Sequence, residues 1–191
     1  MKYSQAESEN LYLDKNLNKF LSINNSWCAS STHESEELFI GQTHKILKKK
    51  IKKLVTIIIP RHIERCFIIK QDLEKLNLKV HLNEPKKKID PSTDIYLVNS
   101  YGKTKSFYKR CNNVFLGGSL IKHGGQNPLE AARYGCSIVS GPNVQNFKEI
   151  YEYLRKNNIS ISVKKNKELA DQLHSLFKKK INPKKIKNKI K

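Results

Sequence analysis

Two glycine pairs flank a serine in the segment GGSLIKHGGQNPLEAA, residues 117–132. Glycine lets the backbone approach a ligand closely, and the pair Gly117 and Gly118 stands directly before the Ser119 hydroxyl, which can hydrogen-bond to a phosphate oxygen. The second pair ends at Gly125. The short apolar run before the segment predicts a strand, so the sequence reads as strand, glycine loop and helix.

The residues after the second glycine pair are typical of a helix start. Asn127 suits the N-cap position, Pro128 the first helical position and Glu130 the carboxylate of a capping box. A helix start carries about half a positive charge, so this arrangement predicts a phosphate or carboxylate site. Glu130 could instead accept hydrogen bonds from sugar hydroxyls. A tight strand-to-helix connection without a ligand explains the same residues.

Two basic side chains follow the apolar run LVTIII and its closing proline. The guanidinium of Arg61 suits bidentate binding of a phosphate or carboxylate, with a surface ion pair to Glu64 as the alternative. His62 could donate to a phosphate or to a base edge, or it could stabilise the loop.

The pair His33 and Glu34 could act as general acid and base, but helix capping by a box at residues 31–34 explains both more simply. The sequence shows no nucleophile beside a base, no carboxylate cluster for a metal and no P-loop lysine, so we assign no catalytic residue and expect no metal or cofactor. The candidate residues describe a binding site for an anionic ligand that bears a sugar.

Alternating strand and helix signals position these residues. Strands are predicted at 27–31, 54–59, 79–82, 94–98, 114–116, 137–140 and 159–163, and helices at 31–50, 63–76, 101–110, 128–134, 145–156 and 167–179. This order predicts an α/β fold, a Rossmann-like parallel sheet with helices on both faces. In such sheets ligands bind beyond the carboxyl ends of the strands. We therefore expect five polar loops, at 31–34, 60–62, 99–102, 117–119 and 141–143, to converge on one edge.

The length of 191 residues suits one domain with tails: a lead-in or remnant of something preceding at 1–25, a domain at 26–179 and a basic tail at 180–191. No stretch approaches the ~20 apolar residues of a membrane span, and no secretory signal is visible. The four cysteines form no CxxC pair, which argues against a metal or disulfide framework and suggests a reducing, cytoplasmic compartment.

The formal net charge of +20 would attract anionic partners. Its lysines gather at 48–53, 86–88, 164–165 and 178–191. These runs lack the interleaved aromatic residues and arginines of nucleic-acid binders, so we do not expect a nucleic-acid partner. The lysine runs are then either solvent-exposed faces of the protein or a surface that binds an anionic membrane.

Four ordered motifs resemble a known family: STHESEE at 31–37, PRHIER at 60–65, GGSLIKHGGQNPLEAA at 117–132 and GPNVQNFKEI at 141–150. In order and spacing they are similar to the C-terminal half of the 3-deoxy-D-manno-octulosonic acid (Kdo) transferases, over about residues 27–177. The resemblance implies the C-terminal half of a glycosyltransferase B-type fold, which binds the donor CMP-Kdo. It also implies metal-independent transfer of Kdo to a lipid A precursor in lipopolysaccharide biosynthesis, at the cytoplasmic face of the inner membrane, with this chain peripheral.

By the same resemblance, six motif residues would contact the CMP portion of the donor. They are Arg61, His62, Gly118, Ser119, Asn127 and Glu130. The chain departs from the family pattern at three positions. Gln126 stands where the family usually has histidine, Ser35 where it has glycine, and Lys103 where many members have an acidic residue.

The family's N-terminal domain, with its membrane anchor, acceptor surface and glutamate general base, has no counterpart in residues 1–26. The chain is then a fragment, a split-gene product whose partner chain supplies that domain, or a protein that has lost transfer activity. Two further hypotheses stay open. One is a non-enzymatic module that binds anionic lipid or RNA, and the other is a transferase or epimerase for another nucleotide-sugar.

Overall fold

A parallel sheet forms the centre of the computed structural model, which describes residues 12–84 and 87–190. The strand order is β3-β4-β2-β1-β5-β6-β7, and each recorded pairing is parallel. The chain builds outward from β1 through β2 on one side and from β5 on the other, so a topological switch point lies between β1 and β5. The strands are β1 (Asn25–Thr32), β2 (Leu54–Pro60), β3 (Val80–Leu82), β4 (Ile95–Leu97), β5 (Asn113–Leu116), β6 (Ser137–Ser140) and β7 (Ser160–Ser162).

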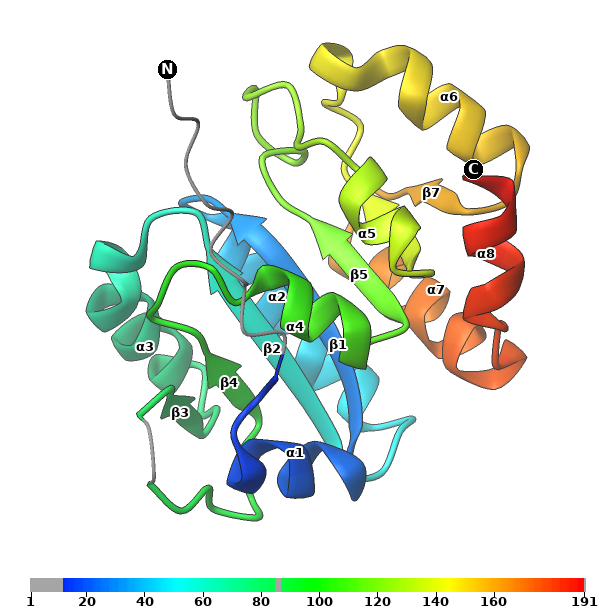
Figure 1. Ribbon diagram of the computed structural model, residues 1–191. Coiled ribbons are helices and arrows are strands. Elements are labelled where there is room, and N and C mark those ends of the chain that lie inside the picture. The colour runs from blue at the N-terminus through cyan, green and yellow to red at the C-terminus, as the bar shows by residue number, and fades with distance from the viewer. Residues whose placement is uncertain (1–11, 85–86, 191) are drawn as a thin grey trace, which may run out of the picture.

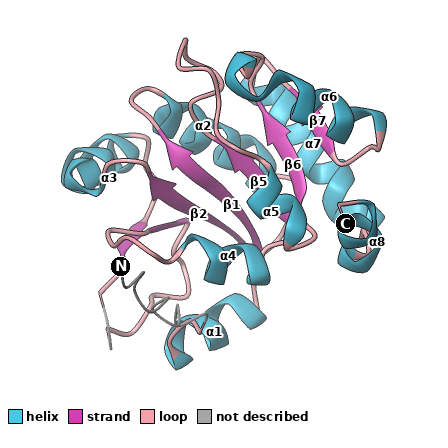
Figure 2. Ribbon diagram, turned by 45° about the horizontal axis from the view of Figure 1, so that its top comes forward, coloured by secondary structure: helices cyan, strands magenta, loops and turns pink. Residues whose placement is uncertain are grey.

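Helices cover both faces of this sheet, as Figures 1 and 2 show, which confirms the predicted fold class. One face packs against α1 (Lys15–Ser22), α4 (Thr104–Arg110), α5 (Leu129–Arg133), α6 (Lys148–Lys156) and α8 (Pro183–Lys189). The other face packs against α2 (Glu36–Lys48), α3 (Cys66–Lys75) and α7 (Asn166–Lys179). Two short 3-10 turns, Ile63–Arg65 and Gln145–Phe147, precede α3 and α6.

Successive residues of the central strands enter opposite cores. In β2, Val55 and Ile57 join the core beneath α4 and α5, whereas Ile58 joins the core beneath α2 and α7. Every residue of β2 is buried. A strand buried on both faces has no solvent side, which is why its sequence is a continuous apolar run rather than an alternating one.

Part of the segment that the sequence assigned to a lead-in is a helix that packs on the core. Helix α1 buries Leu17, Phe20 and Leu21, and the Asp14 carboxylate caps it by accepting hydrogen bonds from two backbone N–H groups. The apolar residues stand at helical spacing, i, i+3 and i+4, although the segment is polar on average. Residues 1–11 of the predicted lead-in lie outside the described residues.

Most of the basic tail at 180–191 is helical and packs on the core. Helix α8 begins after Asn182, whose side chain accepts a hydrogen bond from the Lys184 N–H, and it buries Ile186 against the core. Pro183 lies so close to Gly135 that an added Cβ there would be 2.6 Å from the proline side chain. The lysines of α8 therefore lie on the exposed side of a helix that packs against the core.

The four cysteines are free thiols, and each is buried. Burial raises the pKa of each thiol, to about 11 for Cys66 and about 12 for Cys111. Within the described part of the chain, every helix is too short or too polar to cross a bilayer.

Candidate functional site

Loops that follow β1, β2 and β5 are joined at the carboxyl edge of the sheet. The Gly117 N–H donates to the Ser30 carbonyl at 2.8 Å, and the Arg61 N–H donates to the Thr32 carbonyl at 2.9 Å. The end of β1 therefore holds the loops of both its neighbours. The loop at 99–102 instead hydrogen-bonds to the loop after β3.

Ser119 joins the loop after β6 to this group. Its hydroxyl donates to the Leu116 carbonyl at 2.5 Å and accepts from the Gly141 N–H at 2.8 Å, and its carbonyl accepts from the Asn143 N–H at 2.9 Å. The residue is fully buried. The sequence named this hydroxyl as a candidate donor to a phosphate oxygen, and in this structure it donates its single proton to the Leu116 carbonyl.

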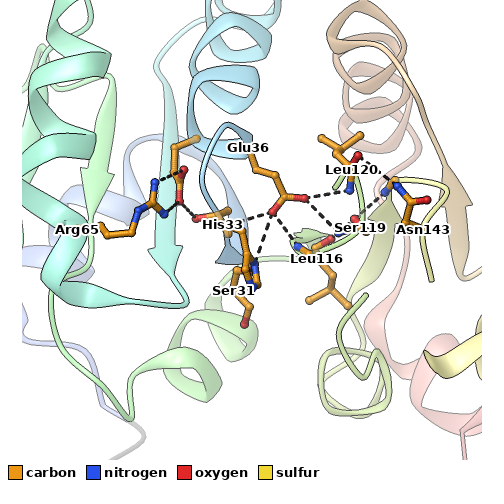
Figure 3. Close-up of polar contacts among 12 residues, drawn as sticks. Ser31, His33, Glu36, Arg65, Leu116, Ser119, Leu120 and Asn143 are labelled. Atoms are coloured by element: carbon orange, nitrogen blue, oxygen red, sulfur yellow. Dashed lines mark hydrogen bonds and ion pairs between the residues drawn. The ribbon is translucent and has the colours of Figure 1, made fainter. Parts of the chain in front are cut away.

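The glycine loop binds an anion, and that anion is the protein's own Glu36 (Figure 3). The Gly118 N–H donates to Oε2 at 2.8 Å, and the N–H groups of Ser119 and Leu120 donate to Oε1 at 3.1 and 3.0 Å. The His33 N–H donates to Oε2 at 3.0 Å. Three successive amides thus form a concave anion site, which the first turn of α2 fills with a carboxylate.

The predicted capping box at 31–34 is wrong, and two buried glutamates replace it. Helix α2 begins at Glu36, after Ser35 in the left-handed conformation with φ 74° and no side-chain cap. Glu37 accepts two hydrogen bonds from the Arg65 guanidinium, at 3.0 and 3.2 Å, and one from the Thr32 hydroxyl at 3.0 Å. Burial raises the pKa of Glu37, and the Arg65 hydrogen bonds oppose that rise. These contacts tie α2 to the segment after β2.

Three imidazoles gather beside the glycine loop. The His33 ring lies 4.3 Å from the His123 ring and 6.1 Å from the His62 ring, measured between centroids. Its Nδ1 is 3.0 Å from the Ser31 carbonyl oxygen, so the Nδ1–H tautomer donates there and leaves Nε2 as an acceptor. Burial lowers the pKa of His33, and the neighbouring His123 lowers it further. His33 therefore sits at the centre of the site and does not cap α2.

Arg61 and His62 lie exposed on the loop after β2. No hydrogen bond or ion pair of the Arg61 side chain is recorded within the described residues, so its guanidinium is available to a ligand. Glu64, which we considered as its alternative partner, lies 3.6 Å from His62 Nδ1 instead. That pair is ionic only when the histidine is protonated.

The glycines serve close packing as well as backbone freedom. A Cβ on Gly117 would lie 2.7 Å from both the Ser31 carbonyl carbon and the Thr32 Cα, and closer still to the Ser31 oxygen. Gly118 and Gly125 have φ of 64° and 82°, and the Gly125 N–H donates to the Gly118 carbonyl at 2.8 Å. The two glycine pairs are therefore bound to each other.

The helix start at α5 differs in detail from the prediction. The helix begins at Leu129 with Pro128 as N-cap, one residue later than predicted, and the Asn127 side chain accepts from the Leu129 N–H at 3.0 Å. Glu130 forms no capping box, and its Oε1 lies 3.8 Å from Lys105 Nζ. Both Asn127 and Glu130 are exposed, so their side chains remain open to a ligand.

Sequence reasoning missed Glu36 and His123 and assigned His33 to a cap. The available signals were two glutamates directly after the loop that follows β1, and a histidine immediately before the second glycine pair. Neither signal distinguishes an internal contact from a ligand contact, because the partners are about 80 residues apart in the chain.

A second polar cluster lies at the opposite, amino edge of the sheet. His44 is within hydrogen-bonding distance of Thr56 and Asp94, at 2.8 and 3.3 Å. Lys48 Nζ and the Lys79 N–H also donate to Asp94, at 2.5 and 2.9 Å. Burial alone would raise the pKa of Asp94, but these hydrogen bonds outweigh it and hold the pKa well below its usual range.

A cavity of about 620 Å³ borders this cluster, between α2 and residues 76–78. It is remote from the glycine loop, so it does not correspond to the predicted site. In the ranges 12–84 and 87–190, no group of three His, Cys, Asp or Glu side chains is arranged to hold a metal ion.

No protein-family model matches the chain. Among curated proteins, the 3-deoxy-D-manno-octulosonic acid transferase of Haemophilus influenzae is 33% identical over 128 residues, which are 67% of this chain and 30% of that protein. The enzyme of the same name from Rickettsia typhi is 32% identical over 78% of this chain and 32% of its own length. The chain thus spans about a third of the length of these relatives.

Two solved structures are also similar to this chain. The C-terminal CMP-Kdo binding domain of WaaA from Acinetobacter baumannii superposes with a TM-score of 0.82 and 26% identity, over 92% of this chain and 91% of that domain. The C-terminal domain of LpcC, a glycosyl transferase group 1 family protein from Francisella tularensis, has a TM-score of 0.52 at 14% identity, over 98% of this chain and 93% of that domain, and supports the fold alone.

Proposed function

Because this chain belongs to the family of Kdo transferases, as a counterpart of their C-terminal domain, we propose that it binds CMP-Kdo. It would supply the donor-binding half of an enzyme that transfers Kdo to a lipid A precursor. The observation that carries this proposal is the match, over nearly the whole chain, to a domain whose name states that it binds CMP-Kdo.

The exposed side chains at the carboxyl edge suit the CMP portion of such a donor. We assign the phosphate to the unpartnered Arg61 guanidinium, with His62 beside it, because a planar cation binds a phosphate through two parallel hydrogen bonds. Asn127 and Glu130 are exposed at the start of α5, where they could bind ribose hydroxyls. As CMP leaves, charge develops on its phosphate, and a positioned arginine would stabilise it.

The complete reaction needs groups that these residues do not include. The chain spans about a third of the length of its relatives, and we assign no catalytic residue to the described part of it. We therefore propose that a further domain, in the same polypeptide or in a separate chain, supplies the acceptor surface and the general base.

The net charge of +20 supports a peripheral position on an anionic membrane, at the cytoplasmic face of the inner membrane. Flotation with anionic vesicles tests this proposal. Replacing Lys184, Lys185 and Lys187 of α8 with glutamine keeps the buried Ile186 and removes three charges. Flotation should fall in this variant, and unchanged flotation would argue against a membrane role for α8.

Calorimetric titration of the 191-residue chain with CMP tests the donor assignment. The wild type should bind CMP, and Arg61→Ala should weaken binding about 10- to 100-fold, since a charge-assisted hydrogen bond contributes about 1.5–3 kcal/mol. Arg155→Ala, on α6, is the matched control and should bind like the wild type. The assignment fails if CMP gives no binding or if Arg61→Ala binds normally. Tighter binding of UDP than of CMP would point to another nucleotide-sugar.

A further inference from the structure

The Glu36 carboxylate is almost fully buried, and its recorded hydrogen bonds come from backbone N–H groups. Each of its two oxygens accepts two of them. Oε2 binds the amides of His33 and Gly118, and Oε1 binds the amides of Ser119 and Leu120. A carboxylate with four short donors is fully satisfied without a cation, and it lies in the first turn of α2, where the helix dipole favours a negative charge.

This carboxylate occupies the place that a bound phosphate would take in a glycine loop. The three successive amides of residues 118–120 point at one concave site, and Glu36 fills it. A second anion in the same site would be repelled by the buried negative charge. Displacing Glu36 would leave a buried carboxylate without its four donors.

The same carboxylate fixes the backbone from which the His33 ring projects. Its Oε2 accepts from both His33 and Gly118, so one atom joins the loop after β1 to the loop after β5. His33 Cε1 would lie 3.3 Å from a Cβ on Gly118, which places the ring directly over the glycine loop. Ser31, with φ 55°, lies in the left-handed region, so this loop also carries backbone strain.

We propose that Glu36 is a positioning residue that holds the glycine loop and His33 in the geometry that receives the donor, and that it keeps the donor's phosphate out of the amide site. The phosphate is then bound by side chains, with Arg61 as the principal cation. This inference rests on the proposed function, because it presumes that CMP binds at this edge.

The first test is Glu36→Gln, which replaces one carboxylate oxygen with an amide group that donates. Two backbone N–H groups then face a donor instead of an acceptor, so the loop must rearrange. Asp94→Asn is the matched control, since it also neutralises a buried, hydrogen-bonded carboxylate but at the opposite edge of the sheet. We expect Glu36→Gln to weaken CMP binding at least about tenfold and Asp94→Asn to change it less than about twofold, with thermal stability lowered in both.

CMP binding by Glu36→Gln within twofold of the wild type would overturn the inference. So would an equal loss of binding in both variants, because the effect would then follow from stability alone. If the wild type itself does not bind CMP, the proposed function fails, and the claim about the phosphate fails with it.

Amide hydrogen exchange of the wild type gives a second test, which does not depend on whether Glu36→Gln folds. The amides of Gly118, Ser119 and Leu120 should exchange slowly without CMP, because Glu36 already accepts from them, and CMP should change their protection less than about twofold. Fast exchange that becomes slow only when CMP binds would show that the ligand fills the amide site, and would overturn the inference.

Discussion

Replacing Gly117 with alanine should destabilise the fold through a backbone collision. The added Cβ would lie 2.7 Å from the Ser31 carbonyl carbon and from the Thr32 Cα, whereas ordinary contacts begin at 3.4 Å. Both neighbours are backbone atoms, so neither can rotate away. Overpacking of this kind costs about 1–3 kcal/mol, and we expect the upper end. For a chain of this size, about 3 kcal/mol lowers the melting temperature by roughly 6–12 °C.

Gly102→Ala is the matched control because it separates crowding from backbone conformation. Gly102 has φ 76°, and a Cβ there meets nothing within 4 Å. Left-handed strain of about 1–2 kcal/mol is partly offset by the lower entropy of the unfolded chain, about 0.4–1 kcal/mol. The expected fall in melting temperature is at most about 6 °C.

Thermal unfolding followed by circular dichroism distinguishes the two variants, and CMP titration adds the functional comparison. A melting temperature of Gly117→Ala within about 2 °C of the wild type would refute the packing argument. Loss of CMP binding without loss of stability would show instead that Gly117 serves the ligand directly, as the sequence alone suggested.

Three further predictions concern other parts of the molecule. The pKa of Asp94 is lower in the folded protein than in the unfolded chain, so its ionised form stabilises the fold above the unfolded pKa of about 3.9. This stabilisation is lost as the pH falls below that value. The urea midpoint should therefore fall more between pH 5 and pH 3 in the wild type than in Asp94→Asn. His33 should titrate below the ordinary histidine pKa of about 6.5 by NMR, and His123→Ala should raise its midpoint. Ile186→Ala should cost about 2–5 kcal/mol in chemical denaturation, whereas the exposed Asn188→Ala should cost little, and equal values would contradict the docking of α8.

The strands and most helices could be predicted because their signals are local. The apolar run at 54–59 and the segment at 137–140 correspond to β2 and β6 almost residue for residue. Helix α1 was missed because its three buried residues are scattered among polar ones. The start of α2 was misplaced because Ser31 and Thr32 have the residue types of a cap, yet β1 continues through both, with an irregularity at Ser31 and Thr32 paired with Pro60 of β2.

The site was predicted as a region more accurately than as a set of contacts. The rule that loops after parallel strands share one edge placed the loops of Arg61 and Gly117 at the same end of β1, where both hydrogen-bond to it. Their individual contacts depend on Glu36, which is about 80 residues away in the chain and competes with any ligand for the same amides. Local patterns cannot show which of two anions occupies these amides. The assignment of the glycine loop to the donor phosphate therefore stays a prediction, and the structure adds that Glu36 accepts from the amides of residues 118–120.

The place of β1 in the middle of the sheet has a consequence for how the chain folds. On one side β1 pairs with β2, the next strand along the chain, but on the other it pairs with β5, so that Cys28 lies opposite Val114. That second pairing closes a loop of more than 80 residues, and such nonlocal contacts slow folding. During synthesis, one edge of β1 stays without its partner until β5 has emerged, which at about 5–20 residues per second takes several seconds. Chains that stop before residue 113 would expose that edge permanently, and they would be prone to aggregate through it.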